Sequence, residues 1–142
     1  MRFARPLLLL ALTAGAAAAA SLDRTTGDGV YTAAQADEGA EIFQQVCMEC
    51  HLPGWHEKVG FYAKWKGRPL SALGNYLRLE MPQTDPGSLS PSEYASVTAY
   101  LLRLTGNPAG STPLNDDADA LADIRIDTLR SAREGARHRP QL

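Results

Sequence analysis

The chain alternates polar stretches, rich in glycine and proline, with stretches in which hydrophobic residues recur every three or four positions. The periodic stretches predict amphipathic helices at residues 33–46, 70–80 and 91–104. A shorter aromatic stretch at residues 61–65 follows a predicted loop at residues 52–60. None of these stretches shows the strict alternation of a half-buried strand, so the pattern predicts an all-α fold.

Capping residues set the predicted ends of these helices. Thr32 can cap the first helix, and Pro82 stops the second because proline cannot continue a helix. The third helix has the clearest start signal. Ser90 is a favourable N-cap, Pro91 suits the first helical position, and Glu93 lies three residues after the cap, as a capping box requires.

Residues 1–20 have the features of an export signal. Arg2 and Arg5 precede an apolar run, and alanines ahead of Ser21 provide the small side chains at which a signal peptidase cuts. A retained membrane anchor is the alternative, but the run is shorter than the ~20 apolar residues that span a bilayer. We therefore expect a cleaved chain, located in the periplasm, with no transmembrane segment.

Cleavage would leave enough chain for one small domain with a mildly acidic charge. The protein has 14 basic and 16 acidic residues, and Arg2 and Arg5 would leave with the signal. A nucleic-acid partner is therefore not expected, because such proteins concentrate positive charge.

Residues 47–51, Cys-Met-Glu-Cys-His, carry the strongest chemical signal. Cys47 and Cys50 lie on one face of a helical turn, where both thiols can add to the vinyl groups of one haem while His51 ligates the iron. They are the chain's two cysteines, so no second pair exists to complete a zinc site. A redox dithiol is the competing interpretation, but it needs a βαβ context. The motif predicts one covalently bound haem c per chain.

Elimination predicts Met81 as the sixth iron ligand. Met1 leaves with the signal, and Met48 lies inside the attachment loop and cannot reach the opposite face of the haem. Met81 follows the second predicted helix, where Leu77 and Leu79 can pack near it. Such a methionine is otherwise a core residue, but with a haem present the pairing of histidine and thioether is typical of electron carriers.

With these residues in place, residues 33–106 resemble the class I cytochrome c fold. In that family a glycine on the first helix lets the last helix cross closely, with aromatic side chains at the contact. Gly39 and Phe43 are similar to the first-helix positions, and Val97 and Tyr100 to the matching pair on the last helix. The resemblance implies three main helices around one covalently bound haem.

Further segments are similar to the cytochrome c domains that serve pyrroloquinoline-quinone alcohol dehydrogenases. They are residues 61–68, Met81-Pro82, residues 86–89, Glu93-Tyr94, residues 29–32 and residues 107–110. The resemblance implies an electron-transfer protein rather than an enzyme. It would take electrons one at a time from a periplasmic dehydrogenase, either as a free carrier or as one of its subunits, and pass them to a terminal oxidase or another cytochrome.

Three further residues are candidates for supporting the haem. The carbonyl of Pro53 can orient the His51 imidazole, and Trp65 and Arg68 are candidate contacts for a haem propionate. All three are equally compatible with ordinary packing or surface roles.

The alternative function is a haem enzyme or gas sensor. In such a protein Met81 would be off the iron, and peroxide or a diatomic ligand would bind in its place. A distal acid-base pair would be needed for catalysis, and the candidates, His56 and Arg68, are more typical of surface positions. The electron carrier is therefore the favoured interpretation.

The segments that flank the domain are polar. We expect residues 21–32 to form an extended N-terminal arm, and residues 107–127 to form a strap that lies back over the domain. The strap would contain a short helix, capped by Asn115 or Asp116, and a strand-like segment. Residues 128–142 are predicted to be a basic, disordered tail, with a docking arm for an acidic partner or a membrane surface as the alternative.

Overall fold

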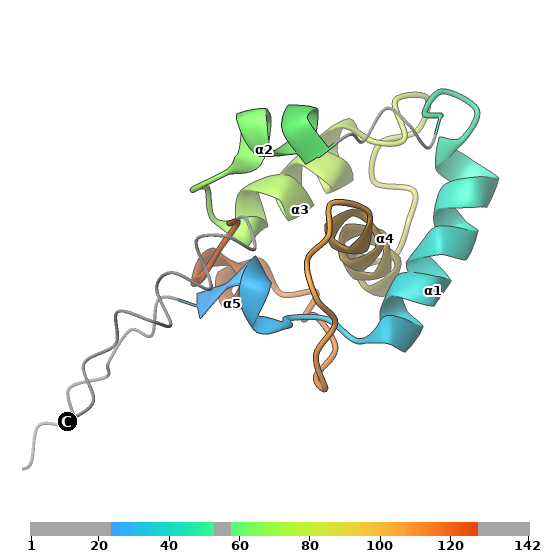
Figure 1. Cartoon of the computed structure of the whole chain (residues 1–142). Coiled ribbons are helices and arrows are strands. Elements are labelled where there is room, and N and C mark those ends of the chain that lie inside the picture. Colours follow the sequence, from blue (N-terminus) through green and yellow to red (C-terminus); the bar gives the residue numbers. More distant parts are fainter. Residues whose placement is uncertain (1–23, 53–57, 128–142) are drawn as a thin grey trace, which may run out of the picture.

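Helices dominate the computed structural model, which describes residues 24–52 and 58–127 (Figure 1). The helices are α1 (Ala33–Ile42), α2 (Lys58–Trp65), α3 (Leu70–Glu80), α4 (Pro91–Leu104) and α5 (Ala118–Ala122). Two short strands, β1 (Arg24–Thr25) and β2 (Ile124–Arg125), pair in parallel. The predicted all-α class is confirmed, and the two strands are too short to show an alternating pattern in the sequence.

The predicted export signal, residues 1–20, and the predicted basic tail, residues 128–142, lie outside the described residues. Within the described residues, no helix combines the length and the hydrophobicity that a membrane span requires.

The predicted caps at Thr32 and Ser90 are confirmed. The Thr32 hydroxyl accepts a hydrogen bond from the backbone N–H of Gln35 at 3.2 Å. The Ser90 hydroxyl accepts from the backbone N–H of Glu93 at 3.3 Å, and the Glu93 carboxylate accepts from the backbone N–H of Ser90 at 2.7 Å. These bonds satisfy backbone donors that have no partner inside the helix. The hydrogen bond from the Ser90 backbone, with that from its hydroxyl, lowers the pKa of Glu93.

Helix α4 lies between α1 and α3 (Figure 1). At the crossing of α1 and α4, a Cβ atom on Gly39 would overlap the backbone carbonyl of Ser96. Four residues along α1, the ring of Phe43 packs against that of Tyr100, with the centroids 5.3 Å apart. The predicted close crossing at Gly39 is confirmed. Its backbone neighbour is Ser96, however, while the adjacent Val97 is buried in the core.

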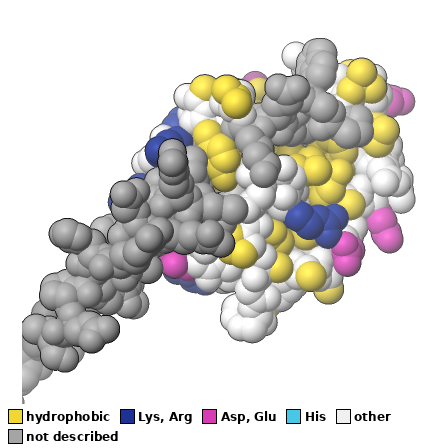
Figure 2. All heavy atoms as spheres, viewed as in Figure 1, with side chains coloured by type: hydrophobic (Ala, Val, Ile, Leu, Met, Phe, Trp, Pro, Cys, Tyr) yellow, Lys and Arg dark blue, Asp and Glu magenta, His cyan; other side chains and the backbone are white. Residues whose placement is uncertain are grey.

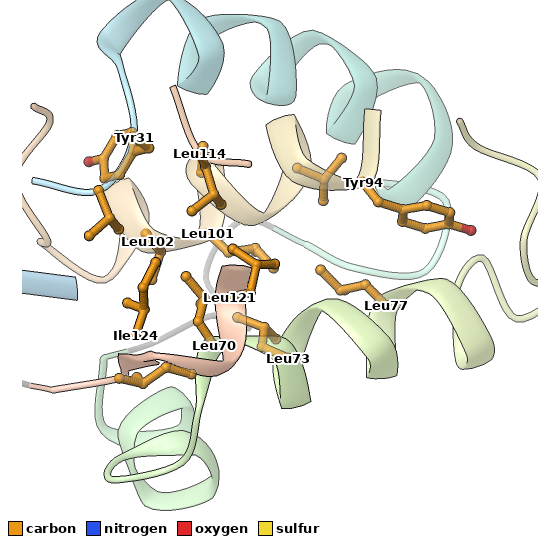
Figure 3. Packing of buried hydrophobic residues seen from close by; sticks show 14 of the residues in the cluster. Tyr31, Leu70, Leu73, Leu77, Tyr94, Leu101, Leu102, Leu114, Leu121 and Ile124 are labelled. Carbon is orange, nitrogen blue, oxygen red and sulfur yellow. The ribbon is translucent and has the colours of Figure 1, made fainter. Parts of the chain in front are cut away.

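A leucine face on α3 closes the other side of the core. Leu70, Leu73 and Leu77 are buried and point from α3 toward residues of α4 and α5 (Figure 3). Each such side chain stabilises the fold by about 1.5–3 kcal/mol when fully buried. The prediction that Leu79 packs near Met81 is wrong, because Leu79 is 65% exposed. Two positions after Leu77, it lies on the opposite face of the helix.

Helix α2 begins earlier than the sequence predicts. The loop was expected to extend to Gly60, but α2 starts at Lys58 and contains Gly60. Glycine inside an exposed helix costs only ~1 kcal/mol relative to alanine, so it does not by itself end a helix. Helix α2 ends with the aromatic stretch, at Trp65, and Gly67 follows in a turn. Gly67 has a φ of 79°, a left-handed conformation that glycine adopts without strain.

The N-terminal arm is not simply extended. After β1 it forms a 3-10 turn, η1 (Thr26–Asp28), and then buries Val30 and Tyr31 in the core. The prediction relied on the polar and glycine-rich composition of the arm. These two hydrophobic residues, which pack against the rest of the domain, outweigh that composition.

The arm and the strap pack against each other. The Tyr31 hydroxyl donates to the carbonyl of Asn107 at 2.6 Å, and the N–H of Gly110 donates to the carbonyl of Tyr31 at 2.6 Å. A Cβ atom on Gly110 would overlap the carbonyl of Gly29, so the two segments approach as closely as their backbones allow.

The strap contains the expected short helix, but the helix starts later than predicted. The N-cap of α5 is Asp117, whose carboxylate accepts from the backbone N–H of Asp119 at 2.9 Å. The predicted cap Asn115 instead accepts from the backbone N–H of Asp117 at 2.7 Å, which forms a turn before the helix. After α5, β2 returns to β1.

The crossing of α1 and α4 gives the first testable prediction. Gly39→Ala should lower the free energy of unfolding by about 1–3 kcal/mol, because its Cβ atom would meet backbone that cannot rotate away. Chemical unfolding followed by circular dichroism measures this. Gly74→Ala is the matched control. Gly74 also lies inside a helix, α3, and a Cβ atom there would meet only a side-chain carbon of Leu121 at 3.5 Å, an ordinary contact, so alanine should stabilise the protein by about 0.5–1 kcal/mol. Equal effects of the two substitutions would contradict the close crossing.

Candidate functional site

A cavity of about 590 Å³ brings together residues from distant parts of the sequence. Cys47, Cys50 and His51 line it from the segment after α1, and Met81 lines it from the segment after α3. Trp65, a predicted haem contact, lines it from the end of α2. Of the six predicted site residues that the structure describes, five therefore share one cavity.

The attachment motif lies in a tight turn at the end of α1. The helix widens into a π-helical turn, η2 (Phe43–Cys47), instead of continuing as the regular helix that the sequence predicted. The backbone N–H groups of Cys50 and His51 then both donate to the carbonyl of Cys47, at 3.2 and 2.9 Å. This turn sets the positions of the two cysteines and the histidine, and π-helical turns are frequent at functional sites.

The two thiols have different surroundings. Cys47 is half-buried, Cys50 is exposed, and they form no disulfide. Burial raises the pKa of the Cys47 thiol. The cysteines of redox dithiols usually have a lowered pKa, so this environment does not favour the thioredoxin-like alternative.

Met81 leaves α3 in an extended conformation and is partly buried. Its backbone carbonyl accepts a hydrogen bond from the Tyr94 hydroxyl at 2.7 Å. The side chain of Leu77, one turn earlier on α3, lines the same cavity, as expected from the sequence. The segment from Met81 to Thr84 also contributes to the lining, so the end of α3 and the loop after it form one part of the wall.

The walls of the cavity suit a large apolar cofactor. Hydrophobic and aromatic side chains from η2 and from α2, α3 and α4 line it: Phe43, Val46, Phe61, Trp65, Tyr76, Leu77, Val97 and Leu101. Its volume lies within the roughly 300–1,000 Å³ typical of ligand pockets. Two thiols, an imidazole and a thioether are the groups that attach and ligate a c-type haem. The residues present therefore fit this cofactor.

Lys64 and Tyr76 are lining residues that the sequence analysis did not identify. The Lys64 ammonium lies 3.9 Å from the centroid of the Tyr76 ring and 5.0 Å from that of Trp65. The face of an aromatic ring attracts a cation at such distances. Phe61, Lys64 and Trp65 are spaced at i, i+3 and i+4 along α2. This spacing places the three side chains on one face of the helix, and it is the sequence signal that could have identified Lys64.

Arg68 lies outside the cavity lining, with its guanidinium carbon 4.8 Å from the centroid of the Trp65 ring. Its contact with a propionate, and that of Trp65, remain predictions. Pro53 and His56, the other candidates near the haem, lie outside the described residues.

No group of three or more His, Cys, Asp or Glu side chains suited to a metal ion occurs in residues 24–52 and 58–127. Acidic and basic side chains are interspersed with hydrophobic ones on the face of the molecule drawn in Figure 2.

Residues 34–101 match the family model of the cbb3-type cytochrome c oxidase subunit III. The matched residues make up just under half of the chain and include the attachment motif and Met81. The match supports a class I c-type cytochrome with a role in haem electron transfer, and the described helices form a small all-α cytochrome c fold. No curated protein and no solved structure gives a significant match to the chain.

Proposed function

We propose that the protein is a periplasmic, single-haem c-type cytochrome that carries electrons from a dehydrogenase toward a terminal oxidase. The observation that carries this proposal is the apolar cavity lined both by the attachment motif and by Met81. A binding protein for another apolar ligand would not need two thiols and two iron-ligating side chains around the same space.

Each of these residues has a defined role. Cys47 and Cys50 would hold the haem through thioether bonds, while His51 and Met81 would ligate its iron. The bound haem supplies a one-electron ferric/ferrous couple. The hydrophobic walls exclude water, and the thioether of Met81 favours the reduced state of the iron more than a nitrogen ligand would.

A carrier is favoured over a haem enzyme or gas sensor. Met81 lines the cavity, which is where a sixth ligand must be for the iron to stay six-coordinate. Arg68, a candidate for the distal pair that an enzyme would need, lies outside the lining. A closed coordination sphere lets oxidation and reduction proceed without binding a substrate.

The direction of electron flow rests on two likenesses. The matched family model is that of an oxidase subunit, which supports an oxidase or another cytochrome as the acceptor. The segments at residues 29–32 and 107–110, which are similar to those of domains serving quinoprotein alcohol dehydrogenases, pack against each other through Gly29 and Gly110. They therefore form one structural unit, and the proposal of a quinoprotein dehydrogenase as the donor rests on the resemblance of these segments alone. The periplasmic location rests on the signal features of residues 1–20.

Covalent attachment is testable by extraction. Haem should stay with the polypeptide through acid-acetone extraction and denaturing electrophoresis, because two thioether bonds resist both treatments. Cys47→Ala and Cys50→Ala should each reduce the haem-stained band. Loss of all haem from unmutated protein, matured in a host with its attachment machinery, would exclude covalent binding.

The ligand role of Met81 is testable with carbon monoxide. The unmutated ferrous protein should bind carbon monoxide poorly at neutral pH, and Met81→Ala should bind it readily because the sixth position opens. Met48→Ala is the matched control and should bind carbon monoxide as poorly as the unmutated protein. Met48 is 37% exposed and does not line the cavity. Absorbance titration measures the binding. Ready binding by the unmutated protein, together with peroxidase turnover, would favour the enzyme or sensor.

The donor is testable by reconstitution. A quinoprotein alcohol dehydrogenase from the same host, supplied with its alcohol, should reduce the ferric protein within the turnover time of the dehydrogenase. A nicotinamide-dependent dehydrogenase with its own substrate serves as the control and should not reduce it. Equal failure of both would reject a quinoprotein donor while leaving the haem assignment intact.

A further inference from the structure

We propose that Tyr94 is the positioning residue that holds the segment carrying Met81 against the cavity, an inference that rests on the proposed function. We call residues 81–87 the Met81 loop. Tyr94 belongs to the first turn of α4 and does not itself line the cavity. It acts through the backbone of the loop rather than by touching the haem.

One phenolic oxygen joins the two ends of the Met81 loop. Tyr94 Oη donates to the carbonyl of Met81 at 2.7 Å and accepts from the backbone N–H of Gly87 at 3.0 Å. Both hydrogen bonds between residues 81–87 and α4 in the described structure end on this oxygen. The first of them fixes the backbone from which the Met81 thioether projects.

The remainder of the loop has few other supports. Residues 83–87 are exposed, and the hydrogen bond from the N–H of Asp85 to the carbonyl of Pro82, at 3.0 Å, lies within the loop itself. Gly87 adopts a left-handed conformation, with φ 83°. The hydrogen bond from Asp85 to Pro82 shapes the turn but does not connect the loop to a helix. The connection to α4 is therefore left to Tyr94.

Tyr94 is well placed to act as a rigid anchor. Its side chain is only 6% exposed, and Figure 3 shows its ring beside the leucines of the core with the hydroxyl pointing away from them. Ser90 and Glu93 fix the start of α4 directly before it, and Ser96 meets Gly39 of α1 directly after it. Helix α1 continues into the attachment motif. The same helix pair thus supports both the attachment motif and the loop that carries Met81.

Tyr94→Phe tests the proposal, because it removes the hydroxyl and keeps the buried ring. In the holoprotein, the fraction of ferrous molecules that binds carbon monoxide should rise roughly two- to tenfold, the effect expected from losing the hydrogen bond to the Met81 carbonyl. The ferric charge-transfer band of the methionine-ligated haem should also disappear at a lower pH. Hydrogen exchange of the Gly87 amide, measured by NMR, should speed up by a similar factor, and this readout does not depend on the haem.

Tyr31→Phe is the matched control. It also removes a buried tyrosine hydroxyl, whose hydrogen bond to the carbonyl of Asn107 is 2.6 Å long, but at the contact of the arm and the strap. It should lower the overall stability without changing carbon monoxide binding or Gly87 exchange. An equal response of the two variants would mean general loosening and would overturn the proposal.

The outcomes separate this inference from the proposed function. If Tyr94→Phe matches the unmutated protein in carbon monoxide binding and in Gly87 exchange, Tyr94 is not the positioning residue, although the carrier assignment stands. If the unmutated protein lacks the ferric methionine band, the carrier assignment fails. The hydrogen exchange of the Gly87 amide then still tests whether Tyr94 holds the loop. An exchange rate that is unchanged in Tyr94→Phe would show that it does not.

Discussion

The contact between the backbones of Gly39 and Ser96 is the constraint on which the rest of the structure depends. It lets α1 and α4 approach until the Phe43 and Tyr100 rings meet, and Arg103 of α4 pairs with Asp37 of α1 near the same crossing. Helix α1 leads into the attachment motif, while α4 supplies walls of the cavity. A small change in the separation of these two helices would therefore alter the position of the cysteines and histidine relative to the opposite wall.

Much of the fold follows from signals that act over a few residues. The caps at Thr32 and Ser90, and the leucine spacing of α3, depend on neighbours within one or two helical turns, so a single sequence reveals them. The start of α2 and the structure of the N-terminal arm were predicted less well. Contacts with residues far along the chain hold Val30 and Tyr31 in place. The composition of a short segment does not reveal such contacts.

The candidate site likewise combines residues that the sequence alone reveals with residues that it does not. The spacing of Cys47, Cys50 and His51 is a local pattern with a specific chemistry, and Met81 followed by elimination because the chain has few methionines. Tyr94 could not be found in this manner. Its bond to Met81 joins residues that are 13 positions apart and depends on how the intervening turn folds back onto α4. The widening of α1 at η2 was likewise invisible in the hydrophobic pattern.

The contact between the arm and the strap bears on the order in which the domain assembles. The Thr26 hydroxyl donates to the carbonyl of Asp127 and accepts from its N–H, at 3.2 and 3.1 Å, across 101 positions of sequence. The entropy lost on closing a chain segment grows with its length, and this segment contains all four long helices. The two strands therefore gain most by pairing after those helices have met. We therefore expect the four helices to assemble first, and the arm and strap to close around them late.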